Sequence, residues 1–197
     1  IVGQIKQQFT SARDSVINLD SAFANIRMTM KMSNEEMQSL GTQSINLAKE
    51  LGTSLESITQ AATIYANQNI STEEIMRRAK PTALLATAAE MSSSSAADLI
   101  QGAMYQFEMS DTVENLNRIV DVVEKISAST GVEFKRSIEQ ISEGIQTTGA
   151  MAYESGYNIE QYSALIGGLV EKTRRNGSEL ANSVKMIFAR LGQNKEG

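Results

Sequence analysis

The chain has 197 residues, of which 41% are hydrophobic and 21% charged, with a single proline and a formal net charge of −5. The hydrophobic and charged fractions are typical of a folded chain. The single proline favours an all-helical chain, since an all-β fold of this length needs many turn residues. The negative net charge argues against duplex nucleic acid as the main partner. Cysteine and histidine are both absent, which excludes disulfides, zinc sites of the His/Cys kind and Ser–His–Asp triads.

Residues 1–32 carry an unbroken heptad pattern, in which apolar side chains recur at alternating spacings of three and four residues. We call these positions the seam: Val2, Ile5, Phe9, Ala12, Val16, Leu19, Phe23, Ile26 and Met30. The pattern predicts one coiled-coil-like helix, about 45 Å long, that either lies on the chain's own bundle or forms a coiled coil with other copies. Because the chain opens on Ile1 inside this pattern, we expect it to be a piece of a longer protein.

Helix starts are marked by Ser, Thr, Asp or Asn followed three residues later by Glu or Gln, because the two side chains satisfy N–H groups that the first turn leaves unpaired. Such capping boxes are predicted at Ser33/Glu36, Thr53/Glu56, Ser71/Glu74, Asp111/Glu114 and Asn158/Gln161. Gly52 is placed to end a helix in a left-handed conformation. With the hydrophobic periodicity, these signals predict helix starts near residues 34, 54, 72, 95, 112, 133, 159 and 178.

The stretch NISTEEIMRRAKP, residues 69–81, combines two acids with two arginines. Glu73 and Glu74 fall in the first turn of a helix, where the helix dipole favours negative charge, and they precede Arg77 and Arg78 by four residues. Adjacent acids on a helix do not face one another. The stretch therefore predicts a helix start and not a catalytic pair of carboxylates.

Between the predicted starts, apolar residues recur with the period of helices that are buried on one face. The fold class is predicted to be all-α, with the long N-terminal heptad helix followed by a compact bundle of about seven shorter helices over residues 33–197. Pro81 predicts a kink or a restart of its helix, and Gly167-Gly168 predicts a close approach of two helices. The last helix is expected to bury Leu180, Val184, Ile187, Phe188 and Leu191.

Several short motifs follow one another in a specific order: SAFANIRMTM, LAKELGTS at residues 47–54, ISTEEI, AADLI, SASTGVEF, YNIEQYSALIGGL and the closing GSELANSVKMIFARL. In this order, the segment from Phe23 to Leu191 resembles the core region of phage tail tape-measure proteins. LAKELGTS followed by the closing motif is the most specific part of the resemblance. Two departures concern local geometry only: Asn69 stands where the family often has glycine, and Pro81 is unusual for the family.

The resemblance implies a structural role. Tape-measure proteins are long, mostly helical chains that lie along the lumen of a growing tail, set tail length during assembly and leave through the tube on infection. The implied location is the virion tail, with the host cytoplasm during assembly. The family core has no catalytic residue, metal site or cofactor to carry over, so we do not expect an enzyme.

The resemblance also implies partners. These are further copies of the chain, which would associate through the seam, together with tail-tube, tail-tip and tail-assembly chaperone proteins. No specific nucleic acid is expected, and contact of the parent chain with the host membrane stays open.

A helical bacterial signalling or pore-forming module is the alternative, because such modules also use long heptads. A carboxylate-based peptidoglycan hydrolase is disfavoured, since no pair of acids is predicted to share a loop or cleft.

Overall fold

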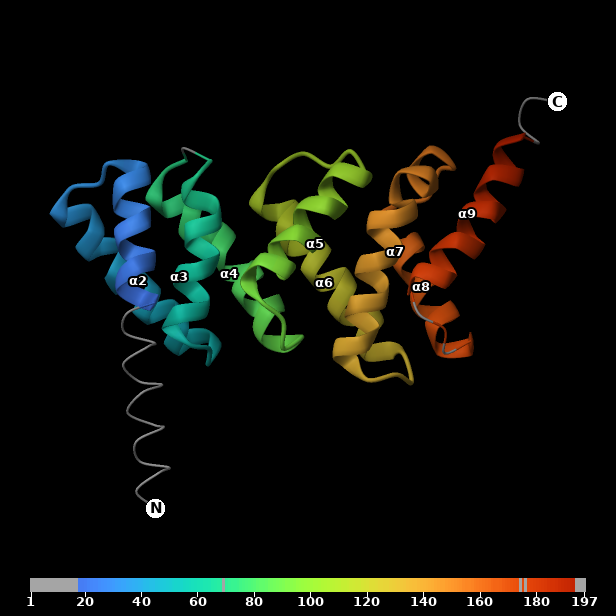
Figure 1. Ribbon diagram of the computed structural model, residues 1–197, viewed down its shortest axis with the longest axis horizontal. Coiled ribbons are helices and arrows are strands. Elements are labelled where there is room, and N and C mark those ends of the chain that lie inside the picture. Colours follow the sequence, from blue (N-terminus) through green and yellow to red (C-terminus); the bar gives the residue numbers. More distant parts are fainter. Residues whose placement is uncertain (1–17, 69, 174, 176, 194–197) are drawn as a thin grey trace, which may run out of the picture. The chain divides into compact units, whose positions relative to one another are not determined.

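The computed structural model describes residues 18–68, 70–173, 175 and 177–193, and every regular element among them is a helix (Figure 1). The predicted all-α class is therefore confirmed for this part of the chain. Residues 18–30 are helical. The helices after them are α2 (Asn34–Leu51), α3 (Leu55–Ala66), α4 (Thr72–Ala88), α5 (Ser93–Gln106), α6 (Val113–Ser129), α7 (Phe134–Glu154), α8 (Ile159–Thr173) and α9 (Gly177–Gln193). Most of the predicted N-terminal heptad helix lies outside the described residues, so its length stays a prediction.

Helices α2 to α9 each begin within two residues of a predicted start. Ser33 and Glu36 form a reciprocal capping box: the Ser33 hydroxyl accepts from the Glu36 N–H at 3.2 Å, and the Glu36 carboxylate accepts from the Ser33 N–H at 2.8 Å. Asn158 and Gln161 do the same at 2.9 and 3.1 Å. These bonds satisfy N–H groups that no helical carbonyl can reach, so the starts are set by residues close in sequence.

Two predicted caps are wrong by one residue. α3 is capped by Ser54, not Thr53, and α6 by Thr112, not Asp111; each capping hydroxyl accepts from the N–H three residues further on, at 3.0 and 3.3 Å. The Thr53 N–H still donates to the Ala48 carbonyl at the end of α2. Because this bond holds Thr53 in the end of α2, Ser54 is the first residue whose backbone can adopt the extended conformation of an N-cap.

Glu74 is the acid that pairs with arginine in the first turn of α4. One carboxylate oxygen lies 3.0 Å from Arg78 Nε and the other 3.6 Å from Arg77 Nη1. The helix continues through the buried Pro81. Of the two predicted outcomes, the restart is therefore wrong, and the kink stays a prediction. The Thr82 hydroxyl donates to the Arg78 carbonyl at 3.1 Å and reinforces the turn that contains the proline.

The chain separates into two compact units near the turn between α4 and α5. Unit 1 comprises Ile1–Thr87 with Ser92–Ser94, and unit 2 comprises Ala88–Met91 with Ser95–Gly197. The predicted division into residues 1–32 and 33–197 rests on a different criterion, the heptad pattern, and stays a prediction.

Unit 1 is held together by apolar residues of α2, α3 and α4. Leu40, Ile58 and Ile75 contribute one fully buried side chain from each of these helices. The Tyr65 hydroxyl of α3 also lies 2.7 Å from Thr82 Oγ1 of α4, in a buried hydrogen bond. Two buried hydroxyls that satisfy each other avoid the cost of an unpaired polar group in the core.

Unit 2 is built around α7, which packs against α6, α8 and α9 (Figure 1). Its inward side chains recur at helical spacing and are fully buried: Ile138, Ile141 and Ile145. The Tyr162 hydroxyl of α8 donates to the Gly144 carbonyl of α7 at 2.7 Å and is paired with the Thr148 hydroxyl. Burial raises the pKa of Tyr162 to about 12, so this hydroxyl keeps its proton and acts as a structural group.

Gly167 lies at a close approach of α8 to α6. A Cβ atom on Gly167 would lie 2.5 Å from Ile126 Cγ2, whereas a Cβ atom on Gly168 would meet no heavy atom within 4 Å. The predicted close approach is therefore confirmed for the first glycine of the pair, and the second takes no part in it.

The two adjacent glycines provide a matched test of this packing. We expect Gly167→Ala to lower the free energy of unfolding by about 1–3 kcal/mol, because the added methyl group forces Ile126 and the α6–α8 contact apart. Gly168→Ala should leave stability unchanged or raise it by up to about 1 kcal/mol, since alanine favours helix. Urea unfolding followed by circular dichroism measures both; equal effects of the two substitutions would contradict the assignment.

Candidate interaction surfaces

The seam lies only partly within the described residues. The positions outside them are Val2, Ile5, Phe9, Ala12 and Val16. Of the others, Ile26 is fully buried, and Leu19, Phe23 and Met30 are half-buried. The chain covers this end of the seam with its own residues, most completely at Ile26. Self-association through the seam stays a prediction.

A groove of about 500 Å³ runs beside the helix of residues 18–30 in unit 1. Asn18, Asn25, Gln60 and Thr63 are among its lining residues, and the Asn18 amide donates to Glu56 Oε1 at 3.3 Å. Apart from Glu56, the lining side chains are neutral. The groove is therefore suited to hydrogen bonding with another chain more than to acid–base chemistry.

A second hollow, of about 490 Å³, lies in unit 2 where the end of α5 meets the end of α7. We call it the α5–α7 cleft, and its lining includes Tyr105, Gln106, Glu108, Met109, Tyr153 and Glu154. Tyr105 is 83% exposed and Tyr153 40% exposed. Tyr153 is held by an edge contact with Phe107, with ring centroids 6.4 Å apart. Aromatic rings exposed in this way are typical of surfaces that bind other proteins.

Gln106 ties the two walls of this cleft together by entering the hydrogen-bond ladder of α7. The Ala150 N–H donates to Gln106 Oε1 at 3.0 Å. Gln106 Nε2 donates at 3.5 Å to the Gln146 carbonyl, which is the acceptor that Ala150 would use in a regular helix. Gly149 allows this approach, because a Cβ atom there would lie 2.9 Å from Gln106 Cβ. The side chain therefore holds the ends of α5 and α7 in one arrangement.

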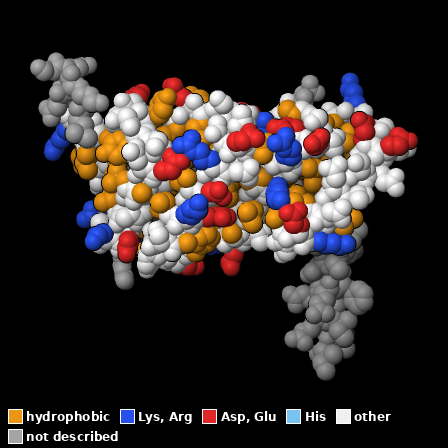
Figure 2. Space-filling view, turned by 180° about the vertical axis from the view of Figure 1, so that it is seen from behind, with side chains coloured by type: hydrophobic (Ala, Val, Ile, Leu, Met, Phe, Trp, Pro, Cys, Tyr) orange, Lys and Arg blue, Asp and Glu red, His pale blue; other side chains and the backbone are white. Residues whose placement is uncertain are grey.

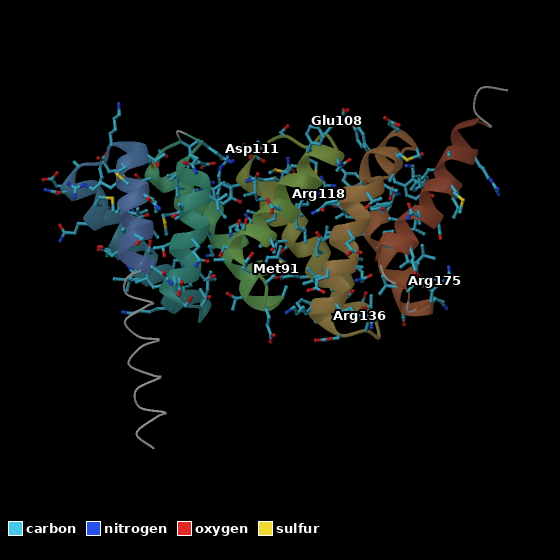
Figure 3. All side chains as sticks on the ribbon, in the orientation of Figure 1. Met91, Glu108, Asp111, Arg118, Arg136 and Arg175 are labelled. Atoms are coloured by element: carbon cyan, nitrogen blue, oxygen red, sulfur yellow. The ribbon has the colours of Figure 1, made fainter. Side chains whose placement is uncertain are left out.

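The rim of the cleft is acidic. Glu108, labelled in Figure 3, follows α5 in a left-handed conformation with φ of 48°, where glycine is usually favoured. The Met109 N–H closes this turn by donating to the Met104 carbonyl at 2.8 Å. Glu108 and Glu154 are both exposed, and neither forms an ion pair with another described residue.

The outward face of α9 carries a second exposed apolar surface. Met186 is 61% exposed and Ile187 55% exposed, and the exposed Arg190 lies one helical turn beyond both. We call these three residues the α9 strip. The expectation that Ile187 is buried is wrong, because α9 packs along one side only. The confirmed buried residues of that side are Leu180, Val184 and Phe188, while the side chain of Leu191 lies outside the described residues.

A groove of about 460 Å³ between α6 and α8 is lined by charges of both signs, including Asp121 and Lys125. Arg118, labelled in Figure 3, donates to Glu160 from Nε at 2.6 Å and from Nη2 at 2.9 Å. This bond lowers the pKa of Glu160 and raises the pKa of Arg118. The Arg118 and Glu160 side chains are 48% and 40% exposed, so solvent screens the pair and it contributes little stability. Figure 2 shows a similar mixture of acidic and basic side chains on the face that it draws.

Glu124 stands apart from these paired charges. Its Oε1 atom is buried and has no hydrogen-bond partner among the described residues. Burial raises the pKa of Glu124, and the neighbouring charge of Asp121 raises it further. The ionised carboxylate is therefore an unfavourable group in the folded state.

The described residues contain no group of three or more acidic side chains that could hold a metal ion. In the same part of the chain, no helix is long and apolar enough to cross a membrane. Among the described residues, the α5–α7 cleft and the α9 strip are surfaces that expose large apolar side chains.

The cleft and the strip were not predicted from the sequence. The available signal was an apolar side chain on the polar face of an amphipathic helix. On α5 this side chain is Tyr105, which directly follows the buried Met104 and precedes the buried Phe107 by two residues. On α9 it is Met186.

A family model described as phage-related minor tail protein matches residues 41–197, well over half of the chain. The matched region includes α3 to α8, α9 with its strip, and both walls of the α5–α7 cleft. The helix of residues 18–30 lies outside it. No solved structure matches the chain.

Glu124 and Glu160 are expected to give opposite dependences of stability on pH. The pKa of Glu124 is raised on folding from its ordinary value of 4.5, so Glu124→Gln should raise the free energy of unfolding at neutral pH. This gain shrinks as the pH falls through the folded-state pKa and is absent below the unfolded value. The pKa of Glu160 is lowered on folding, so Glu160→Gln should lower stability at neutral pH, and this loss also fades as the pH falls.

Urea midpoints at neutral pH and at about pH 3 would measure both variants. They should approach the wild-type value from opposite sides at the lower pH. A loss of stability for Glu124→Gln at neutral pH would contradict the assigned burial of its carboxylate.

Proposed function

This chain belongs to the phage-related minor tail protein family, and from that premise we propose that it is a segment of a tape-measure protein. In this role the parent chain sets tail length during assembly and is released through the tube on infection. The chain resides in the virion tail, and in the host cytoplasm while tails assemble. Its partners are tail-tube, tail-tip and tail-assembly chaperone proteins.

The observation that carries the proposal is the place of the tape-measure-like motifs within the family match. LAKELGTS covers the last turns of α2, its left-handed end at Gly52 and the Ser54 cap of α3. GSELANSVKMIFARL begins α9 and runs along most of it. The two most specific motifs thus fall at the beginning and the end of the matched residues 41–197.

The helical fold also suits a ruler. A helix extends by about 1.5 Å per residue, so the length of a mainly helical chain is proportional to its number of residues. Short caps such as Ser33/Glu36 and Asn158/Gln161 define helix ends by local hydrogen bonds. Helices that are defined locally can keep their form even where the tertiary contacts between them change.

In-frame deletions in the parent gene, made in helical parts outside this segment, test the ruler function. We expect tails to shorten by about 1.5 Å for each deleted residue, as measured by electron microscopy. In-frame insertions of the same length should lengthen tails by the same amount. Tails of unchanged length in both series would reject the tape-measure role and favour a helical signalling or pore-forming module.

We further propose that copies of the chain associate through the seam. Leu19→Asp should lower the oligomeric mass measured by light scattering, because it places a charge in an apolar stripe. Ala24→Asp, on an exposed position of the same helix outside the seam, is the matched control and should leave the mass unchanged. If Leu19→Asp keeps the wild-type mass and helicity, the seam packs on the chain's own bundle and not on a second copy.

A further inference from the structure

We propose that unit 2 also binds a second copy of this chain head to tail, with the α9 strip of one copy seated in the α5–α7 cleft of the next. This contact is separate from the seam, which belongs to unit 1, and it does not depend on the tape-measure role. It follows from two surfaces of unit 2 that carry matching apolar groups and opposite charges.

The α9 strip is the inserting surface. Met186 and Ile187 are more than half exposed on a helix whose opposite side is fully buried in unit 2. Arg190 lies four residues after Met186 and three after Ile187, so its guanidinium stands beside both apolar side chains on the helix surface. Arg190 forms no ion pair with another described residue. The strip thus presents two apolar groups and one positive charge that no described residue pairs with.

The α5–α7 cleft is the receiving surface. Tyr105, Met109 and Tyr153 give it an apolar lining, and methionine and tyrosine adapt readily to a partner's side chains. Glu108 and Glu154 add two exposed carboxylates that have no cation of their own among the described residues. A free cleft of about 490 Å³ is large enough to receive two side chains of the size of methionine and isoleucine.

Charge complementarity selects a second copy as the occupant. An acidic rim around an aromatic cleft fits a helix that combines apolar side chains with an arginine, which is the composition of the α9 strip. The backbone of Glu108 is left-handed, a conformation in which glycine would be less strained. With glutamate at this position, a carboxylate lies on the rim of the cleft. Since the strip and the cleft are different surfaces, the contact is heterologous and can continue from copy to copy.

The rigidity of both surfaces supports the same conclusion. Gln106 fixes the walls of the cleft through its hydrogen bonds with α7, and Phe188 anchors α9 against Tyr157, with ring centroids 5.3 Å apart. Preformed surfaces lose little conformational entropy on binding. A small contact of this kind is expected to be weak and sensitive to salt, as its charges are exposed.

Sedimentation velocity of the whole chain carrying Leu19→Asp, which removes association through the seam, tests the proposal over a concentration series. Met186→Asp removes the inserting surface and Tyr105→Asp the receiving surface; each should weaken self-association through unit 2 by at least about tenfold. Ala128→Asp, which adds the same charge at an exposed position of α6, is the matched control and should behave as the Leu19→Asp chain without it. Both test positions are exposed, so circular dichroism should show unchanged folding.

Mixing the two variants is the decisive step. The Met186→Asp chain keeps an intact cleft, and the Tyr105→Asp chain keeps an intact strip, so an equimolar mixture should form a 1:1 complex that neither variant forms alone. A mixture that forms no such complex would overturn the proposal. So would a Leu19→Asp chain that stays monomeric up to about 1 mM, or an association of that chain that neither Met186→Asp nor Tyr105→Asp weakens.

A charge exchange tests the electrostatic part. Arg190→Glu and the double variant Glu108→Lys/Glu154→Lys should each lose association, because like charges then face one another. Their equimolar mixture should regain it, since opposite charges are restored across the contact. Failure of the mixture to associate would show that Arg190 and the two acids do not meet, and would overturn the proposed arrangement.

Discussion

The close approach of helices to α7 and to one another is the constraint on which unit 2 depends. α7 directs three isoleucines into the core. It also has glycine at positions 144 and 149, where side chains of neighbouring helices pack directly against its backbone. Ile166 of α8 fills the space above Gly144, and Gln106 of α5 fills the space above Gly149. Gly167 performs the same role between α8 and α6. Because an added methyl group at these positions would force the neighbouring side chains to shift, the glycines determine how closely the helices approach one another.

The same packing determines which surfaces remain open. Gln106 is drawn into the ladder of α7, which brings the ends of α5 and α7 together while Tyr105, on the next position, faces solvent. α9 is held on one side by Leu180, Val184 and Phe188, which leaves Met186 and Arg190 outside. The exposed apolar groups are thus a consequence of how the core is filled. A phage tail protein has to form contacts with other chains, and such surfaces are where those contacts can form.

The buried polar groups show how far unit 2 tolerates departures from an apolar core. Tyr162 and Thr148 satisfy each other and the Gly144 carbonyl, so their burial costs little. Glu124 has no such partner among the described residues for one of its oxygens. Its pKa is raised because burial makes the ionised carboxylate unfavourable. Natural proteins rarely have maximal stability, and one such unpaired oxygen is compatible with a folded unit 2.

The sequence by itself determined the all-α class of the described residues, the approximate starts of α2 to α9 and the Ser33 and Asn158 capping boxes, because each of these depends on residues close together in the chain. It also indicated a close approach at Gly167, since glycine has no side chain, but not that Ile126 of α6 is the neighbour. It also supplied the ordered motifs that point to a phage tail protein. Only the tertiary structure decided that α4 continues through Pro81 and that Ile187 faces outward. It alone revealed the α5–α7 cleft, which joins residues more than forty positions apart, such as Gln106 and Ala150. Periodicity shows that a helix has a buried face, but the width of that face is set by the neighbours that cover it, and these are known only once the helices are packed.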